Sequence, residues 1–237
     1  MSHYAIRPEM VNYLLQNGYN FEPTRYIREG YNLFKQYALG FVLATVLLVA
    51  IQLIGEVLDA VRESSLFSTL FNLVAIPLSY GYLIVAHKIH RGEKPIFSDF
   101  FSFFSSFDKY IITLAYAIFG TALIMLGFIV FILPGIYLAV GYMFGANFLF
   151  FGGFGVWESL EMSRKLVAKN WWLVFGFCLL LFLVIVAGVA CLGVGILAAL
   201  PIMYCAIYAA FADLMQQADA HSWQYLGEPE TDTNEGF

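Results

Sequence analysis

Polar and apolar positions are unevenly distributed along the chain, and four long stretches contain no Asp, Glu, Lys or Arg. They run from Gln36 to Gly55, Ser64 to Ala86, Tyr110 to Trp157 and Asn170 to Ala212, and comprise 20, 23, 48 and 43 residues. A helix needs about 20 residues to cross the hydrocarbon core of a bilayer. The first two stretches therefore suit one span each and the last two suit two each, which predicts six transmembrane helices.

The two long stretches contain helix-breaking residues near their middles. Pro134-Gly135 divides the third stretch, and Gly193 and Gly195 divide the fourth. We therefore predict an all-α fold, a polytopic transmembrane bundle of six helices. The expected spans are Gln36 to Leu58, Leu66 to Ile89, Tyr110 to Leu133, Gly135 to Phe151, Trp171 to Leu192, and Ile196 to Gln216.

An amphipathic segment precedes each predicted hairpin of two spans. These segments begin at Pro23-Thr24, Pro95 and Gly155, and their aromatic and aliphatic residues recur at helical spacing opposite charged and polar ones. Next to a span, such a helix is expected to lie in the headgroup layer with its apolar stripe in the acyl boundary. One interfacial helix, one outward span and one returning span would form a unit. We expect three repeated units, at about residues 24–90, 95–153 and 156–218, within a membrane domain of residues 24–218.

The four-residue pattern Pro-x-x-Tyr occurs once in each predicted hairpin. One interpretation is structural, because Pro suits the first turn of a helix and Tyr is common at membrane interfaces. The other is that the tyrosines converge on a cavity or groove. The cavity or packing candidates are Pro77, Tyr80, Pro134, Tyr137, Asn147, Pro201 and Tyr204.

Basic residues fall almost entirely on one predicted side. Eleven of the twelve Lys and Arg residues lie before the first span or in the loops that follow the second and fourth, and Arg62 alone lies on the other side. The positive-inside rule makes the basic side cytoplasmic, with both termini inside. We expect residues 1–23 to form a cytoplasmic N-terminal segment and residues 219–237 to form a disordered acidic tail.

Composition supports the membrane interpretation and limits the chemistry. Charged residues make up 12% of the chain, about half the usual share in soluble proteins, and the mean hydropathy is +0.76. The net charge of −5 argues against a nucleic-acid partner. The spans offer essentially no ionisable groups away from their ends, and no phosphate-binding glycine motif occurs, so we expect no enzymatic activity and no cofactor. The three cysteines form no CxxC pair and are expected to be apolar fillers.

Several segments together resemble a broad family of uncharacterised bacterial six-span membrane proteins. They are Arg28 to Lys35, Arg91 to Phe101, Ile132 to Tyr137, and Trp157 to Ser163 with Asn170-Trp171-Trp172. This family is related to the membrane domain fused to some glycerophosphodiester phosphodiesterases. The resemblance covers about residues 24 to 216 and implies the architecture and a bacterial inner membrane, but no catalytic residues.

The leading hypothesis is a non-enzymatic integral membrane protein that binds lipid or another amphiphile, or serves as an accessory subunit of a larger membrane complex. Its expected partners are membrane lipids and other membrane-protein subunits. The alternative is a small-molecule facilitator or a substrate-binding component of a transporter. A metal held by His87 and His90 would instead favour catalysis, although no metal site is expected. The lipid-headgroup candidates are Arg28, Lys35, His87, Arg91, Lys94, Arg164 and Lys165.

Overall fold

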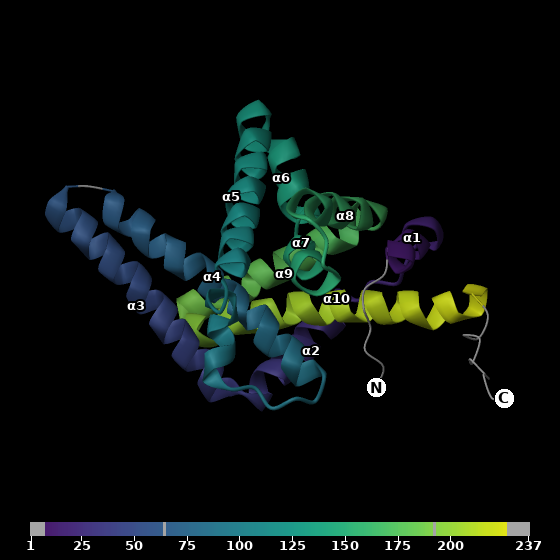
Figure 1. Ribbon diagram of the computed structural model, residues 1–237, viewed down its shortest axis with the longest axis horizontal. Helices are drawn as coiled ribbons and strands as arrows, with labels where there is room; N and C mark the ends of the chain where they lie inside the picture. The colour runs from purple at the N-terminus through teal and green to yellow at the C-terminus, as the bar shows by residue number, and fades with distance from the viewer. Residues whose placement is uncertain (1–7, 64, 192, 227–237) are drawn as a thin grey trace, which may run out of the picture.

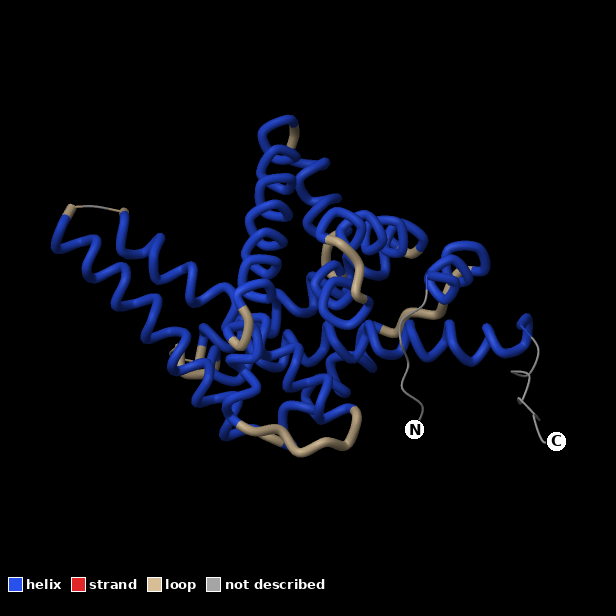
Figure 2. The backbone as a smooth tube through the Cα atoms, in the orientation of Figure 1, coloured by secondary structure: helices blue, strands red, loops and turns tan. Residues whose placement is uncertain are grey.

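The computed structural model describes residues 8–63, 65–191 and 193–226, and these residues form helices and connections without a strand (Figure 2). Element bounds follow the charge pattern of the sequence closely. The elements are α1 (Pro8–Asn17), α2 (Pro23–Gln36), α3 (Ala38–Arg62), α4 (Leu66–His90), the 3-10 helix η1 (Phe97–Phe104), α5 (Phe107–Val130), α6 (Ile132–Gly141), α7 (Gly145–Gly152), α8 (Val156–Lys169), α9 (Trp171–Ala190) and α10 (Ile196–Leu226).

Six of the helical segments are long and apolar enough to cross a membrane, which confirms the predicted number of spans within the described residues. The chain is thus a multi-pass membrane protein of the all-α class. The spans are Ala38–Arg62, Leu66–His90, Phe107–Val130, Ile132–Gly152, Trp171–Ala190 and Ile196–Ala220.

The third and fourth spans differ in detail from the prediction. The chain turns at Phe131, and Pro134 lies in the first turn of α6, where a missing N–H group costs no hydrogen bond. The break expected at Pro134-Gly135 therefore occurs about three residues earlier. The fourth span was also expected to be continuous, but α6 ends at Gly141 and α7 begins at Gly145.

The hairpins α3–α4 and α5–α6 point in different directions from a shared centre, where they meet the α9–α10 pair (Figure 1). The outer ends of the first two hairpins are poorly covered by protein: Val61 in α3 is 72% exposed and Ile129 in α5 is 79% exposed. Apolar side chains at these ends suit contact with acyl chains. The packed core lies instead at the other end of the hairpins, where α10 contacts α2, α3, α4 and α9.

Each hairpin is preceded by one short helical element, namely α2, η1 or α8. That the three units are repeats of one another stays a prediction. The stripe of α2 differs from the expectation, because Gly30 and Phe34 are buried against protein although Tyr31 remains half exposed. The reason is that α10 lies along α2, with the backbone of Ala206 directly above Gly30.

Helices extend beyond the expected membrane domain of residues 24–218 in both directions. Residues 8–17 form α1, whose Met10, Val11 and Leu14 are buried in the core beside α8 and α10. The expected tail from residue 219 is helical as far as Leu226, because α10 continues beyond the end of its span. The remainder of the tail lies outside the described residues.

Candidate functional site

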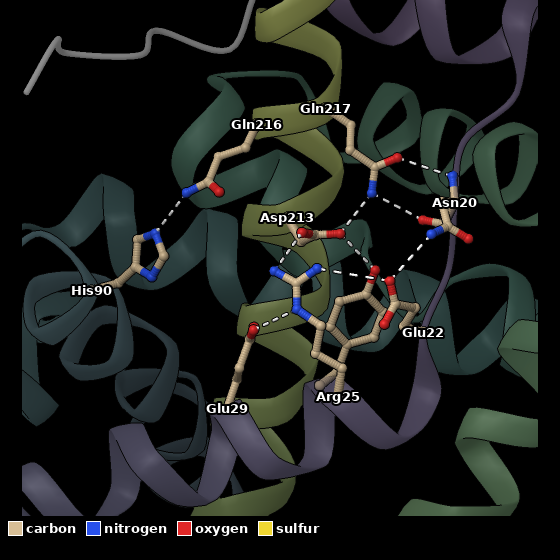
Figure 3. Close-up of polar contacts among 9 residues, drawn as sticks. Asn20, Glu22, Arg25, Glu29, His90, Asp213, Gln216 and Gln217 are labelled. Atoms are coloured by element: carbon tan, nitrogen blue, oxygen red, sulfur yellow. Dashed lines mark hydrogen bonds and ion pairs between the residues drawn. The ribbon is translucent and has the colours of Figure 1, made fainter.

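A pocket of about 220 Å³, lined mainly by polar residues, lies where α2, α4 and α10 meet. Figure 3 shows the polar contacts around it. Its position coincides with the ends of three spans: His90 is the last residue of α4, α2 immediately precedes the span of α3, and Gln216 lies four residues before the end of the span in α10. This is the depth at which lipid headgroups meet a membrane protein. The lining residues are Arg25, Glu29, Asn32, Leu33, His90, Ala209, Asp213 and Gln216.

Asp213 organises the floor of this pocket. Its side chain is 11% exposed, and one carboxylate oxygen, Oδ2, accepts hydrogen bonds from the Tyr26 hydroxyl at 2.7 Å and from Gln217 Nε2 at 2.6 Å. The other oxygen forms an ion pair with Arg25 Nη2 at 3.2 Å. A carboxylate near the end of an apolar span is thus satisfied by a cation and two neutral donors, which is what allows it to be buried.

Close helix packing brings these groups together. Gly30 faces the backbone of Ala206, and a Cβ atom at Gly30 would lie 2.6 Å from the Ala206 nitrogen. Because glycine leaves this space free, α2 can approach α10 closely enough for Arg25 and Tyr26 to reach Asp213. Arg25, Glu29 and Asn32 follow one another at helical spacing and so share one face of α2.

The pocket carries more negative than positive charge. Three carboxylates surround the Arg25 guanidinium: Glu29 at 2.7 Å, Asp213 at 3.2 Å and Glu22 at 3.9 Å. The hydrogen bond that Arg25 donates to Glu29 and the charge of Asp213 raise the pKa of Arg25. Burial, together with the hydrogen bond to Asp213, raises the pKa of the Tyr26 hydroxyl well above its usual value. Two carboxylates and one guanidinium in the lining leave an excess negative charge.

The opposite wall of the pocket is formed by the end of α4. His90 Nε2 lies 3.2 Å from Gln216 Nε2, and the ring of His90 meets that of Tyr208 edge-on. His87 Nδ1 lies 2.8 Å from the Tyr208 hydroxyl, and its ring stacks on Phe151. No group of three His, Cys, Asp or Glu side chains in the described part of the chain is arranged to hold a metal ion.

Hydrogen bonds hold the loop between α1 and α2 beside the pocket. Gln217 accepts a hydrogen bond from the backbone N–H of Asn20 at 2.9 Å and donates one to the Asn20 carbonyl at 3.0 Å. Asn170 donates to the Tyr19 carbonyl at 2.9 Å. Since Gln217 also donates to Asp213, the loop and the floor of the pocket are held by one side chain.

None of the seven expected headgroup residues lines the pocket. Arg28, Lys35 and Lys94 are exposed, and Lys35 Nζ lies 4.7 Å from the centre of the Tyr31 ring. Arg28 precedes the pocket residue Asn32 by one helical turn in α2. The remaining candidates contact other side chains: His87 contacts Tyr208, Arg91 pairs with Glu93 at 3.0 Å, and Arg164 and Lys165 both pair with Glu161, at 2.7 and 3.5 Å.

The Pro-x-x-Tyr motifs of the three predicted hairpins lie in different surroundings. Tyr80 packs against Tyr116 and Phe150. Tyr204 stacks on Tyr82. These two motif tyrosines thus pack against the same buried cluster, which includes side chains of α4 and α10.

Tyr137 instead accepts a hydrogen bond from Arg164 at 3.3 Å and stacks on Trp171. Pro134 is exposed near the α5–α6 turn, whereas Pro77 and Pro201 lie inside α4 and α10. Pro77 cannot donate to the carbonyl of Leu73, and the Tyr110 hydroxyl donates to that carbonyl instead, at 3.3 Å.

Sequence reasoning did not select the residues of the pocket as a site. Arg25, Glu29 and Asn32 were assigned only to the polar face of an amphipathic helix. A usable signal was present at Asp213, because this residue ends the longest charge-free stretch in the second half of the chain. An acid at the margin of a span predicts a cationic partner, although it does not identify that partner.

Comparison with known proteins identifies no relative for this arrangement: no family model, no curated protein and no solved structure matches the chain. The resemblance to the membrane domain of glycerophosphodiester phosphodiesterases stays a prediction from the sequence.

Proposed function

We propose that this chain is a non-enzymatic membrane protein that binds a phospholipid headgroup carrying an amine in the pocket between α2, α4 and α10. The observation that carries the proposal is the pocket itself, a charged cavity at the ends of three spans. A cavity at this depth is reached by headgroups from the bilayer, whereas a water-soluble ligand would reach it from one side only.

The charge of the lining favours an amine. Glu29 and Asp213 supply two carboxylates, and the single guanidinium of Arg25 neutralises one of them. An ammonium group would compensate the excess negative charge and donate hydrogen bonds to carboxylate oxygens. The exposed Arg28, one helical turn before Asn32, would then be available to the phosphate of the same zwitterionic lipid.

The orientation belongs to the same proposal. Eleven of twelve basic residues fall on the side of the pocket, so we place this side in the cytoplasm, with both termini inside and with the bacterial inner membrane as the location. The bound lipid would then come from the cytoplasmic leaflet. A role as an accessory subunit is compatible with this, because bound lipid can sit between membrane-protein partners.

Native mass spectrometry of the detergent-solubilised protein tests the proposal. We expect phosphatidylethanolamine to be retained several-fold better than phosphatidylcholine or phosphatidylglycerol with the same acyl chains. Glu29→Gln should reduce this preference, because it removes a carboxylate from the lining. Glu93→Gln is the matched control, since Glu93 pairs with Arg91 outside the pocket.

Equal retention of the three lipids, or the same effect from both variants, would rule out recognition of an amine in this pocket. A stoichiometric protein subunit in the same spectra would support the accessory-subunit form of the hypothesis.

A second candidate function is facilitated passage of a small uncharged solute. It is favoured by the interruption of the fourth span between Gly141 and Gly145, because discontinuous membrane helices commonly border substrate sites. Osmotic swelling of proteoliposomes in glycerol tests it: permeability no greater than that of protein-free vesicles would exclude glycerol passage.

A further inference from the structure

The interruption of the fourth span lies at its centre and is closed by a side chain from another helix. The span covers Ile132–Gly152, and the helical hydrogen-bond pattern is broken between Gly141 and Gly145. Ser163 of α8 donates to the Gly141 carbonyl at 2.6 Å and accepts from the Phe144 N–H at 3.1 Å. Because Ser163 bonds to the backbone groups that the break leaves without helical partners, the fold stabilises the break.

Asn147 lies in α7 directly after this break and is completely buried, with 0% of its surface exposed. Neither its amide nitrogen nor its amide oxygen has a hydrogen-bond partner among the described residues. A primary amide offers two donor hydrogens and an acceptor oxygen, and buried groups of this kind are nearly always paired in folded proteins. An occupant that supplies both a donor and an acceptor would complete the site.

Helical register places Asn147 on the face of α7 that looks towards α4 and α10. Residues three and four positions further along a helix flank the same face, and here they are Phe150 and Phe151. The Phe150 ring meets Tyr80 of α4 at 5.4 Å, and the Phe151 ring meets Tyr208 of α10 at 5.6 Å. Asn147 thus belongs to the junction of the three returning spans.

The residues of this junction lie near the middle of their spans, and so at a similar depth in the membrane. Tyr80 lies near the middle of the span in α4, and Tyr204 and Tyr208 lie near the middle of the span in α10. The polar groups that are available at mid-depth therefore come from the same set of helices as Asn147.

We propose that Asn147 is the centre of an internal binding site for a small uncharged molecule with hydrogen-bond donors and acceptors, either a resident water or a neutral alcohol such as glycerol. The occupant is uncharged because no Asp, Glu, Lys or Arg occurs between Tyr110 and Trp157 to balance a charge. It is small because the neighbouring Phe144 and Phe148 are also completely buried. This site is separate from the headgroup pocket and does not depend on lipid binding there.

Thermal unfolding of the full chain in detergent provides the first test. Asn147→Leu keeps the branched shape of the side chain and removes its polar atoms, and Asn147→Ala removes them without adding volume. The control is Thr45→Val, because Thr45 is equally buried and its hydroxyl is bonded to Tyr82 at 2.8 Å. If Asn147 holds an occupant, both substitutions should lower the Tm at least as much as Thr45→Val does. A rise in Tm for Asn147→Leu overturns the proposal, because it means that the amide is buried without a partner.

Nuclear magnetic resonance then identifies the occupant. The side-chain amide signal of Asn147, assigned by its loss in Asn147→Leu, should show cross-peaks to water protons, or to glycerol protons when glycerol is added to the perdeuterated detergent. Water cross-peaks identify a resident water, and glycerol cross-peaks identify an exchangeable solute. A lower Tm without either cross-peak also overturns the proposal, since the loss then comes from packing alone. Failure of lipid retention in the mass spectra would leave both measurements unaffected.

Discussion

Replacing Asp213 by Asn or by Leu would measure how strongly the floor of the pocket holds α2 against α10. Asp213 has three donors, of which Tyr26 and Gln217 share one carboxylate oxygen and Arg25 contacts the other. An Asn side chain can keep its oxygen towards Tyr26 and Gln217 but then turns its NH2 group towards the guanidinium. A Leu side chain removes the carboxylate from all three donors, and although Arg25 keeps Glu29 and Gln217 keeps the Asn20 carbonyl, the Tyr26 hydroxyl is left without an acceptor.

The two substitutions should therefore differ in cost. A hydrogen bond to a charged group contributes about 1.5–3 kcal/mol, but Arg25 is 39% exposed and keeps Glu29, so we expect only about 1 kcal/mol for Asp213→Asn. Asp213→Leu also leaves the hydroxyl of the fully buried Tyr26 without an acceptor, and an unsatisfied buried group costs about 1–3 kcal/mol. The total expected for Asp213→Leu is about 3 kcal/mol.

Unfolding by SDS titration, followed by far-UV circular dichroism, would give these differences in the free energy of unfolding. The matched control is Glu29→Gln, which removes a half-exposed partner of the same guanidinium and should cost no more than about 0.5 kcal/mol. Equal losses for Asp213→Asn and Asp213→Leu would refute the assignment of separate roles to the two carboxylate oxygens. If Glu29→Gln lowered the free energy of unfolding as much as Asp213→Leu, the greater burial of Asp213 would not explain its larger contribution to stability.

Two further substitutions test the packing and the electrostatics of other elements. Gly30→Ala should cost about 1–3 kcal/mol in the same titration, because the new methyl group would collide with the backbone of Ala206. The control is Gly176→Ala in α9, which should be neutral or stabilising because no atom lies within 4 Å of the added methyl group. A neutral Gly30→Ala would contradict close contact between α2 and α10. The hydrogen bond from Arg164 lowers the pKa of Glu161 below its usual value of about 4.3, so this pair should stabilise the fold at higher pH and lose its effect as the pH falls through the lowered pKa. Thermal unfolding between about pH 6 and pH 3 should therefore depend less on pH in Glu161→Gln than in the wild type, and identical profiles would contradict this role.

The number and limits of the spans could be predicted from the sequence because they depend on a local property. A charge-free stretch of sufficient length specifies a membrane helix without reference to the rest of the chain. The break at Gly193 was equally local, since this residue adopts a positive φ of 75° between α9 and α10. Pro134 misled the boundary because proline is accommodated in the first turn of a helix as readily as before it.

The pocket and the broken span could not be predicted in the same way. Asp213 and Tyr26 are 187 positions apart, and nothing near either residue in the sequence specifies the other. Gly141 and Gly145 flank the break in the fourth span, but glycines at this spacing are just as typical of closely packed continuous helices. Ser163, which closes the break, comes from a helix that appeared from its sequence to be merely amphipathic.

The separation between α2 and α10 also determines an order of events during synthesis. With 187 positions between Tyr26 and Asp213, α2 leaves the ribosome roughly 10–40 s before its partner surface is made. During that interval the stripe around Gly30 and Phe34 has no protein to cover it, and the bilayer surface is the nearest apolar phase. We therefore expect α2 to occupy the headgroup layer, the position predicted from its sequence, until α10 has been made and can cover the stripe.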